Sequence, residues 1–231
     1  MKKIMVAAVA AFALGAFAQD SELEGGSQLW RLSIGGFGRG SMRLKSEDMP
    51  SGRFEMYGAD ADVLFKAYET EDFNFWTGVG FGWAPNQRVY NKSRVWNFPG
   101  VTVSNAEKND LQYGELRLVA VPEWKATDDI LLGLRLGVAF DWTRCKNHRH
   151  STVSIPPLPP IAEDGSETYS DFLAQGIVGL QGTYMFTENI GLYAAIDWRG
   201  GSDPTLKKNG ITYGKLSMDG WHASVGATVQ F

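Results

Sequence analysis

The chain has 231 residues, a net charge of −4, 44% hydrophobic residues and a single cysteine. The acidic balance argues against nucleic acid as a partner, because nucleic-acid-binding proteins carry clustered Lys and Arg. One cysteine cannot form an internal disulfide, so covalent cross-links play no part in holding the chain together.

The first 18 residues have the organisation of an export signal. Lys2 and Lys3 precede a short apolar segment at residues 4–17, and small residues stand before Gln19, where cleavage is expected. An apolar run of about 14 residues is too short for a transmembrane helix, which needs about 20. We therefore expect residues 1–18 to be a signal peptide. Its removal takes away two lysines and changes the net charge from −4 to −6.

Eight later segments alternate apolar and polar residues, as β-strands with two different faces do. In the clearest segment, apolar residues at even positions from Ile130 to Trp142 alternate with Gly, Arg, Ala and Asp at odd positions. The other seven segments lie at residues 30–34, 56–66, 73–83, 115–124, 171–186, 190–199 and 221–231. An even number of such strands is typical of an up-and-down barrel that spans a membrane.

A soluble β-sandwich or a lipocalin-like barrel also alternates, but two features argue against it here. The polar faces are too charged and too rich in glycine for a water-facing exterior, whereas they suit a narrow interior. In addition, aromatic residues stand at the ends of the apolar faces, as they do at the two interfaces of a bilayer. The residues expected there are Trp30, Tyr57, Trp83, Trp124, Trp142, Tyr184, Trp198, Trp221 and Phe231. We therefore predict an all-β fold: an eight-stranded antiparallel up-and-down transmembrane β-barrel over residues 19–231.

The connections between the segments alternate in length. Short turns are expected at residues 69–72, 126–129 and 187–189, and long external loops at 41–53, 85–110, 144–168 and 200–212. Short periplasmic turns and long outer loops are typical of outer-membrane barrels, and this arrangement places both chain ends on the periplasmic side. Within the third long loop, the proline-rich residues 155–160 predict a stiff, extended spacer.

The polar faces carry charges of both signs that the predicted barrel would enclose. An eight-stranded barrel has an interior just wide enough for its own side chains, and an unpaired charge buried there is costly. We interpret these residues as a salt-bridged plug, with a narrow ion path as the alternative. Counted from the strand ends, Arg31, Lys66 and Glu123 form a low layer, and Asp60, Arg117, Asp197, Arg199 and His222 form a higher one. The full set is Arg31, Asp60, Asp62, Lys66, Glu115, Arg117, Glu123, Arg135, Asp141, Asp197, Arg199 and His222.

His222 and Ser224 form an H-x-S pair that resembles the catalytic pair of an outer-membrane lipid A deacylase. A triad needs a carboxylate that orients the histidine, and Asp197 on the neighbouring segment is the candidate. The alternation, however, points both side chains into the interior, away from acyl chains. We therefore favour a histidine packed among interior hydrogen bonds, and expect no catalytic residue.

Cys145, His148 and His150 form a C-x2-H-x-H pattern in the third long loop, and such side chains suit zinc or copper. Three ligands in a basic segment are too few to indicate a site, so we expect no metal, and no motif indicates a cofactor. The basic residues beside the pattern, Arg144, Lys146 and Arg149, suit either a solvated surface or the phosphates of lipopolysaccharide.

The last segment, Trp221 to Phe231, alternates throughout and ends on an aromatic residue. With the rest of residues 19–231, it resembles the small eight-stranded outer-membrane barrels of the outer-membrane protein A, X and W type. The resemblance implies location in a bacterial outer membrane and recognition of the last strand by the barrel-assembly machinery. Val229 departs from it, because many members have an aromatic residue there. We expect no peptidoglycan-binding domain of the kind that outer-membrane protein A carries after its barrel.

Members of this group include adhesins, structural anchors and small pores, so the resemblance implies a fold and not one function. Our first hypothesis is a non-catalytic barrel that anchors surface loops with a structural or binding role. A small or gated porin-like channel is the alternative, and a lipid A-modifying enzyme is the third. The expected partners are outer-membrane lipid and lipopolysaccharide, the barrel-assembly machinery and an extracellular ligand of unknown identity.

Overall fold

The computed structural model describes residues 29–45, 52–201, 205–208 and 211–231. The expected signal peptide at residues 1–18 lies outside the described residues. In the described part of the chain, no helix is long and apolar enough to cross a membrane. The strands are β1 (Trp30–Lys45), β2 (Gly52–Glu69), β3 (Phe73–Phe98), β4 (Val101–Lys125), β5 (Ile130–Ser154), β6 (Ile161–Met185), β7 (Ile190–Gly201), β8 (Thr205–Lys208), β9 (Ile211–Ser217) and β10 (Gly220–Gln230).

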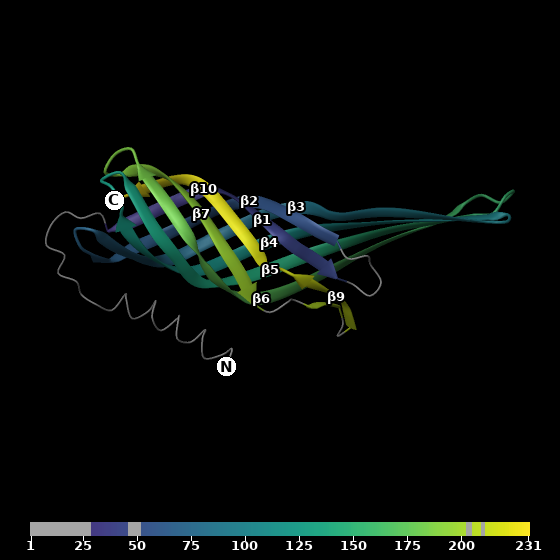
Figure 1. Ribbon diagram of the computed structural model, residues 1–231. Coiled ribbons are helices and arrows are strands. Elements are labelled where there is room, and N and C mark those ends of the chain that lie inside the picture. The colour runs from purple at the N-terminus through teal and green to yellow at the C-terminus, as the bar shows by residue number, and fades with distance from the viewer. Residues whose placement is uncertain (1–28, 46–51, 202–204, 209–210) are drawn as a thin grey trace.

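Eight of these strands, β1 to β7 and β10, form a closed barrel (Figure 1). Each strand from β1 to β7 pairs antiparallel with the next, and β10 pairs with both β7 and β1. At the closing seam, the Trp30 amide donates to the Phe231 carbonyl at 2.8 Å and the Phe231 amide donates to the Trp30 carbonyl at 2.9 Å. The predicted fold is confirmed. The short hairpin β8–β9 is added at one end, where β9 pairs with β1.

The exterior of the barrel is apolar, because alternate residues of every strand point outward. On β5, for example, Leu132, Leu134 and Leu136 are exposed, while Gly133 and Arg135 between them are buried. All backbone groups of a closed barrel can pair within it, which hydrocarbon requires of any spanning structure. The nine aromatic residues expected at the interfaces all point outward and are exposed. Trp30 and Phe231 lie at one end of this belt, and Trp142 lies toward the other, opposite Phe172.

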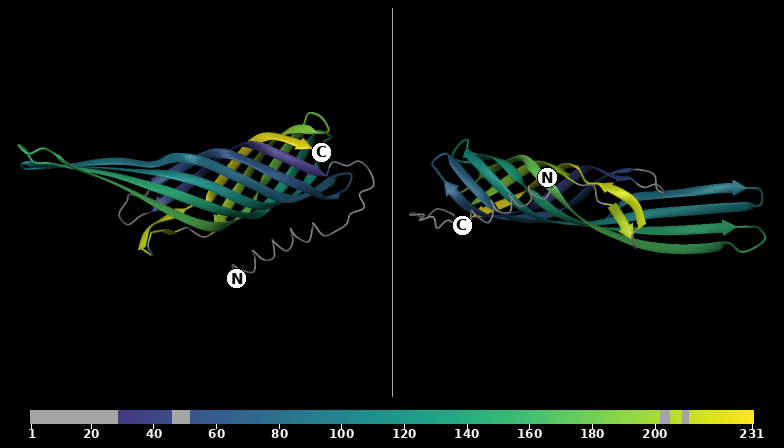
Figure 2. Two further views of the ribbon diagram at one scale, coloured as in Figure 1. Left: turned by 180° about the vertical axis from the view of Figure 1, so that it is seen from behind. Right: turned by 90° about the horizontal axis from the view of Figure 1, so that it is seen from below.

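The segments predicted as long loops at 85–110 and 144–168 are strands, so that prediction is wrong. β3 to β6 continue beyond the barrel as one antiparallel sheet, shown in Figures 1 and 2. The backbone there pairs across all four strands, from β3–β4 to β5–β6. We call residues 88–98, 101–110, 146–154 and 161–168 the projecting sheet. Residues 91–98 and 161–166 are all exposed, so the alternation that marks the barrel strands disappears toward the tip of this sheet.

Two turns end the projecting sheet. Gly100, with a φ of 78°, makes the turn between β3 and β4, in a conformation that glycine adopts freely. The proline-rich residues 155–160 make the turn between β5 and β6. The sequence predicts an extended spacer there, and that prediction is wrong. Proline has no amide hydrogen to donate to a strand ladder, so these residues end the strand pairing at the tip of the sheet.

Two apolar clusters occupy the inside of the barrel. The deeper cluster consists of Leu64, Trp76, Val119, Val121, Ala139 and Ile177. The second lies at the end that carries the projecting sheet and consists of Phe37, Met42, Phe54, Met56, Ala84, Leu111, Tyr113, Cys145, Tyr169, Leu173 and Met218. The interior is therefore filled by apolar side chains as well as by charges.

Candidate functional site: the charged interior of the barrel

All twelve residues that the sequence placed in the interior have buried side chains, each at most 4% exposed. They come from β1, β2, β4, β5, β7 and β10, so the site is formed only when these strands close into a barrel. Their contacts divide into a small lower group and a large upper group.

The lower group is centred on Arg31 and Glu123. The Arg31 guanidinium donates two hydrogen bonds to the Glu123 carboxylate, at 2.9 and 2.7 Å. The Trp76 indole donates to the same carboxylate at 3.1 Å, and the guanidinium carbon lies 4.2 Å from the centre of its ring. The Lys66 Nζ lies 5.1 Å from the centre of that ring and 3.0 Å from the Glu69 carboxylate. Trp76 was not among the predicted site residues.

Arg117 is the centre of the upper group and contacts three carboxylates. Its Nε lies 2.7 Å from Asp62, one terminal nitrogen lies 2.8 Å from Glu115, and the other lies 3.0 Å from Asp60. Gly80 on β3 makes room for this arrangement, because a Cβ there would overlap both Asp62 Oδ1 and Arg117 Nε. All three nitrogens of the Arg117 guanidinium thus contact buried carboxylates.

Arg135 and Arg199 extend the upper group around the barrel wall. Arg135 donates to Asp62 at 3.1 Å and to Gln181 at 2.9 Å, and its Nε forms an ion pair with Asp197 at 3.3 Å. Arg199 contacts Glu115 and, at 3.4 Å, Asp197. The structure thus joins the predicted upper-layer residues Asp60, Arg117, Asp197 and Arg199 into one network with Asp62, Glu115 and Arg135.

Arg39 is a central member of the network that sequence reasoning missed. Its guanidinium lies 3.2 Å from Asp141, donates to the Tyr113 hydroxyl at 2.8 Å, and also donates to the Met218 carbonyl at 2.6 Å. With Arg39 included, the buried charges balance: among the described residues there are six cations and six anions. They are Arg31, Arg39, Lys66, Arg117, Arg135 and Arg199, and Asp60, Asp62, Glu115, Glu123, Asp141 and Asp197.

A signal for Arg39 was present in the sequence. It shares the odd numbering of Arg31 and Ser33 on β1 and therefore their inward face. The predicted set also held five of these cations against six anions, so one cation was missing. The apolar Phe37, which is buried on the same face, obscured the continuation of the polar face.

His222 does not form a catalytic pair in this structure. Among the described residues, neither of its ring nitrogens has a hydrogen-bond partner, and its ring stacks on Phe37 with 4.7 Å between the ring centres. Asp197 lies opposite His222 in the strand register, but its oxygens face Arg135 and Arg199. Ser224 is buried on the same inward face. A histidine without an orienting carboxylate lacks the arrangement that activates a serine.

The pattern of Cys145, His148 and His150 is divided between the two faces of β5. Cys145 is buried toward the interior, whereas the two histidines lie at even positions on the opposite face. His150 Nδ1 lies 2.6 Å from Asp164, and His148 Nε2 lies 3.9 Å from Asp110. Within residues 29–45, 52–201, 205–208 and 211–231, no group of three such side chains is arranged to hold a metal ion.

A groove of about 650 Å³ lies on the outer surface where the apolar belt meets the projecting sheet. Trp83, Trp142 and Phe172 contribute its apolar part. The polar part is contributed by Gln112, Thr143, Arg144, Ser170 and the carboxylate of Asp171. The groove therefore offers an aromatic surface beside a polar part that carries one cation and one carboxylate.

No protein-family model and no curated protein matches the chain. Solved structures do. Ail, the attachment invasion locus protein of Yersinia pestis, matches at 14% identity with a TM-score of 0.43, over 89% of this chain and 99% of Ail. The outer membrane protein OprG from Pseudomonas aeruginosa matches at 8% identity and a TM-score of 0.43, over 89% and 96% of the two chains. Neisserial surface protein A matches at 11% identity and a TM-score of 0.42, over 87% and 97%. These are similarities of fold only.

Proposed function

We propose that this small outer-membrane β-barrel is a non-catalytic membrane anchor with a closed interior, and that it presents the projecting sheet at the cell surface. The observation that carries the proposal is the balance of six buried cations against six buried anions. Each has an oppositely charged partner, and only Lys66 finds its partner outside this set, in the partly exposed Glu69. An interior filled by paired side chains gives a rigid support and leaves little width for a solute.

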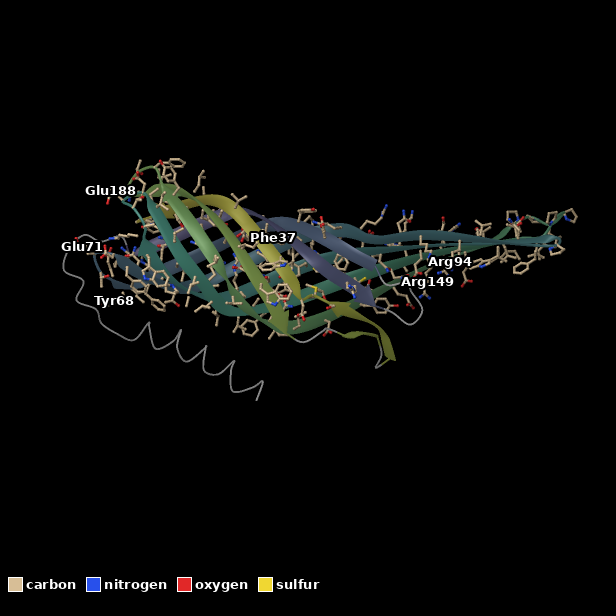
Figure 3. All side chains as sticks on the ribbon, viewed as in Figure 1. Phe37, Tyr68, Glu71, Arg94, Arg149 and Glu188 are labelled. Atoms are coloured by element: carbon tan, nitrogen blue, oxygen red, sulfur yellow. The ribbon has the colours of Figure 1, made fainter. Side chains whose placement is uncertain are left out.

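The orientation follows from the lengths of the connections. The turns after β2, β4 and β6 are short and lie at the same end as both ends of the barrel wall, Trp30 and Phe231. In outer-membrane barrels such turns face the periplasm and the long connections face outward. Figure 3 places Glu71 and Glu188 at this end and Arg94 and Arg149 on the projecting sheet at the other. The sheet is therefore proposed to stand outside the cell.

Three partners belong to this proposal. The groove beside Trp142 and Arg144 is proposed to contact lipopolysaccharide, since its aromatic part fits acyl chains and its arginine, although Asp171 lines the same groove, fits a phosphate. The last strand, β10, with its terminal Phe231, is proposed to be read by the barrel-assembly machinery. The projecting sheet is proposed to hold the binding surface for an extracellular ligand. Residues 1–18 are proposed to direct export and then to be removed.

A small or gated channel is the second candidate. It is favoured by one observation: several buried polar atoms of the upper group have no hydrogen-bond partner among the described residues, including Arg39 Nε, Arg199 Nε and both ring nitrogens of His222. Such atoms would be satisfied in a water-filled path. A lipid A-modifying enzyme ranks third, because His222 and Ser224 face the interior.

Conductance of the purified protein in a planar bilayer separates the first two functions. We expect no steady current, because the ion-paired side chains fill the interior, and a steady current from the unmodified protein would make the channel the better hypothesis.

A variant with a shortened sheet tests the anchor. Residues 91–108 and 148–166 are each replaced by a short Gly-Ser turn, at positions that face each other in the sheet. The barrel should remain folded and heat-modifiable on gels, as its own contacts are kept.

A further inference from the structure

The projecting sheet has two open edges. β3 pairs with β2 only as far as Trp83, and β6 pairs with β7 only as far as Gln175. Beyond these residues, β3 has only β4 and β6 has only β5 as a paired strand among the described residues. The hairpin β8–β9 contacts β6 near the barrel without pairing with it (Figure 1). An open edge presents unpaired backbone donors and acceptors to a further strand.

The side chain of Gln87 marks the point where the edge of β3 becomes open. The Tyr57 amide on β2 donates to Gln87 Oε1 at 3.1 Å, and Gln87 Nε2 donates to the Tyr57 carbonyl. An amide side chain thus takes the place of a β3 backbone partner at Tyr57. From Arg88 onward, β3 has no described strand on that side.

The two open edges carry charges of opposite sign. Residues 88–98 of β3 contain no Asp or Glu, and their cations are Arg88, Lys92 and Arg94. Residues 161–168 of β6 contain no Lys or Arg, and their anions are Glu163, Asp164 and Glu167. The inner strands carry both signs: Glu107 faces Lys92 in the sheet and lies 3.5 Å from Arg149. Charges of one sign on both edges would keep two copies apart, whereas opposite signs attract.

The charges of the two edges cannot neutralise each other within one chain. Arg94 and Glu163 end the same row of the sheet, in which the residues between them are Asn105 and Ser151. Neighbouring strands lie about 4.8 Å apart, so three spacings separate the two backbones by about 14 Å. Both side chains are exposed. Their opposite charges are therefore available to a second molecule.

Two copies in one membrane present these edges in opposite directions. β3 runs from the turn at residues 70–72 to the tip of the sheet, and β6 runs from the tip back to the turn at residues 186–189. Copies inserted with the same orientation therefore place β3 of one antiparallel to β6 of the other, as neighbouring strands of the barrel already are. Their apolar belts hold both copies at the same depth, so rows of equal height face each other.

Aligned at equal height, the open edges match residue by residue. Glu163 of one copy then faces Arg94 of the next, because these two residues end the same row. Ile161 faces Trp96 in the same way, since the row between them consists of Val103 and Val153. Facing residues share one face of a sheet. A shift by one residue would put the acidic and basic side chains on opposite faces.

Lys92 also gains anionic neighbours in this alignment. It lies opposite Gly165 of the next copy, and the space beside Gly165 is open. Glu163 and Glu167 lie two residues to either side of Gly165, on the same face of β6. Such diagonal positions are within reach of a long side chain.

We propose that the projecting sheet binds a second copy of this chain in the same membrane, by antiparallel pairing of β6 of one copy with β3 of the next. Backbone hydrogen bonds between the edges supply the affinity, and the opposite charges select unlike edges. A contact of this head-to-tail kind can extend into a row of copies. The inference goes beyond the proposed anchor, because it requires only copies inserted in one orientation and does not depend on what the interior does.

Disulfide trapping in intact outer membranes tests the pairing. The variant Arg94→Cys, Glu163→Cys places one thiol on each edge, and the natural Cys145 is buried. Within one chain the new thiols cannot join, because a disulfide needs Cα atoms less than about 7 Å apart. Mild oxidation should therefore give dimers and longer species on non-reducing gels, and reduction should remove them.

Two kinds of control accompany this variant. Arg94→Cys alone and Glu163→Cys alone should stay monomeric, because like edges do not meet. Arg94→Cys with Thr168→Cys is the matched pair: Thr168 lies on β6 five positions from Glu163 and on the other face. Its yield of dimers should be several-fold lower than that of the facing pair.

An exchange of charges tests what selects the edges, with Trp96→Cys and Ile161→Cys as the trapped pair. Adding Lys92→Glu and Arg94→Glu should lower the yield of dimers several-fold, since both edges are then acidic. Adding Glu163→Lys and Glu167→Lys as well should restore it, because the two edges again differ in sign. A yield that does not respond to these changes would contradict selection by charge.

Three results would overturn the inference. They are monomers only from the variant with a thiol on each edge, dimers from either single variant, and equal yields from the facing and the matched control pairs. Dimers that form in cells but not from the purified protein in liposomes would also overturn it, since another component would then bridge the copies. Any of these results, in a protein that remains heat-modifiable and non-conducting, leaves the proposed anchor intact. A steady current would instead contradict the anchor and would not change the trapping result.

Discussion

Arg31 on β1 and Glu123 on β4 are 92 residues apart in the sequence and form two hydrogen bonds, of 2.9 and 2.7 Å, inside the barrel. Both side chains are completely buried. Two parallel hydrogen bonds between a guanidinium and a carboxylate fix the orientation of both groups as well as their distance. The Trp76 ring beside them covers the guanidinium.

Removing one partner of this pair should cost far more stability than removing both. Glu123→Ala leaves the buried Arg31 without its carboxylate, and we expect a loss of about 3–5 kcal/mol in the free energy of unfolding. Arg31→Met with Glu123→Leu should lose clearly less, because no charge stays unpaired. Urea unfolding of the reconstituted barrel, followed by tryptophan fluorescence, measures both.

The exposed pair of Arg88 and Asp110, 3.4 Å apart on the projecting sheet, provides the control. Its removal by Arg88→Ala should change the free energy of unfolding by less than about 1 kcal/mol. Equal losses from the single and double changes at Arg31 and Glu123 would show that the pair is not the source of the effect.

Gly80 and Gly82 on β3 should respond differently to the same substitution. In Gly80→Ala the new methyl group would overlap Asp62 Oδ1 and Arg117 Nε, so the network must move and the barrel should be destabilised. In Gly82→Ala the nearest atom is Glu115 Cβ at 3.4 Å, an ordinary contact. We expect a loss of about 1–3 kcal/mol for the first variant only, since overpacking has this cost. The urea midpoint checks it, and a similar midpoint for both variants would contradict the tight fit around Arg117.

Cys145 should be unreactive in the folded protein. It lies on β5 three residues beyond Trp142, outside the apolar belt, among the buried side chains of the cluster at the outer end of the barrel. Burial, with a smaller contribution from the Asp110 carboxylate, raises the pKa of the Cys145 thiol to about 12. Since the thiolate is the reactive form, we expect no maleimide labelling at pH 8 until the protein is unfolded. Rapid labelling of the folded barrel would mean that the outer end of the interior is open.

The same thiol makes a contribution to stability that depends on pH. The pKa of Cys145 is higher in the folded chain than its ordinary value of 9.0, so the contribution is complete below pH 9. This contribution is lost as the pH rises from 9 toward 12, because only the thiol of the unfolded chain then ionises. The free energy of unfolding falls by at most about 1.4 kcal/mol per pH unit. Comparison with Cys145→Ala over this range isolates the contribution. Identical pH profiles for the two proteins would contradict it.

Removal of Phe231 should lower the amount of folded barrel in the membrane. The deletion removes the two backbone hydrogen bonds to Trp30 at the closing seam and the aromatic side chain at the membrane edge. Phe231→Ala keeps the backbone bonds, so its steady-state level should lie between those of the deletion and the unmodified protein. Quantitative blots of outer membranes measure the three levels. If the deletion matched the unmodified protein, the terminal residue would be incidental to assembly.

The barrel itself could be predicted from the sequence because lipid and interior impose opposite demands on alternate residues. Residues 130–142 show this most clearly: their leucines face outward and Arg135 and Asp141 face inward. The same alternation was sufficient to place twelve polar residues in the interior. It could not say which charges meet, because partners such as Arg117 and Asp62 lie on different strands, and their contact depends on the shear of the barrel.

The projecting sheet could not be predicted, because no alternation of polar and apolar residues marks its strands. Ser104, Asn105 and Thr152 are all partly exposed. Neither face of the sheet is buried there, so polar and apolar residues do not alternate. What keeps these segments extended is pairing with their neighbours, as between Asn105 and Ser151, which is a property of the assembled sheet. Trp76 could not be predicted as a site residue, because a large aromatic residue on an inward face interrupts the expected polar pattern.

The long sequence separation of the interior ion pairs has a consequence for biogenesis. Arg117 and Asp62 are 55 residues apart, Arg199 and Glu115 are 84 apart, and Arg39 and Asp141 are 102 apart. A single hairpin entering the bilayer by itself would keep the pairs within one strand, such as Arg117 with Glu115, but would carry Arg39 and most of the other charges into hydrocarbon without their partners. Stepwise insertion, hairpin after hairpin, is therefore disfavoured, and the strands must meet one another before or while they leave water. The barrel should enter the membrane as one nearly complete unit.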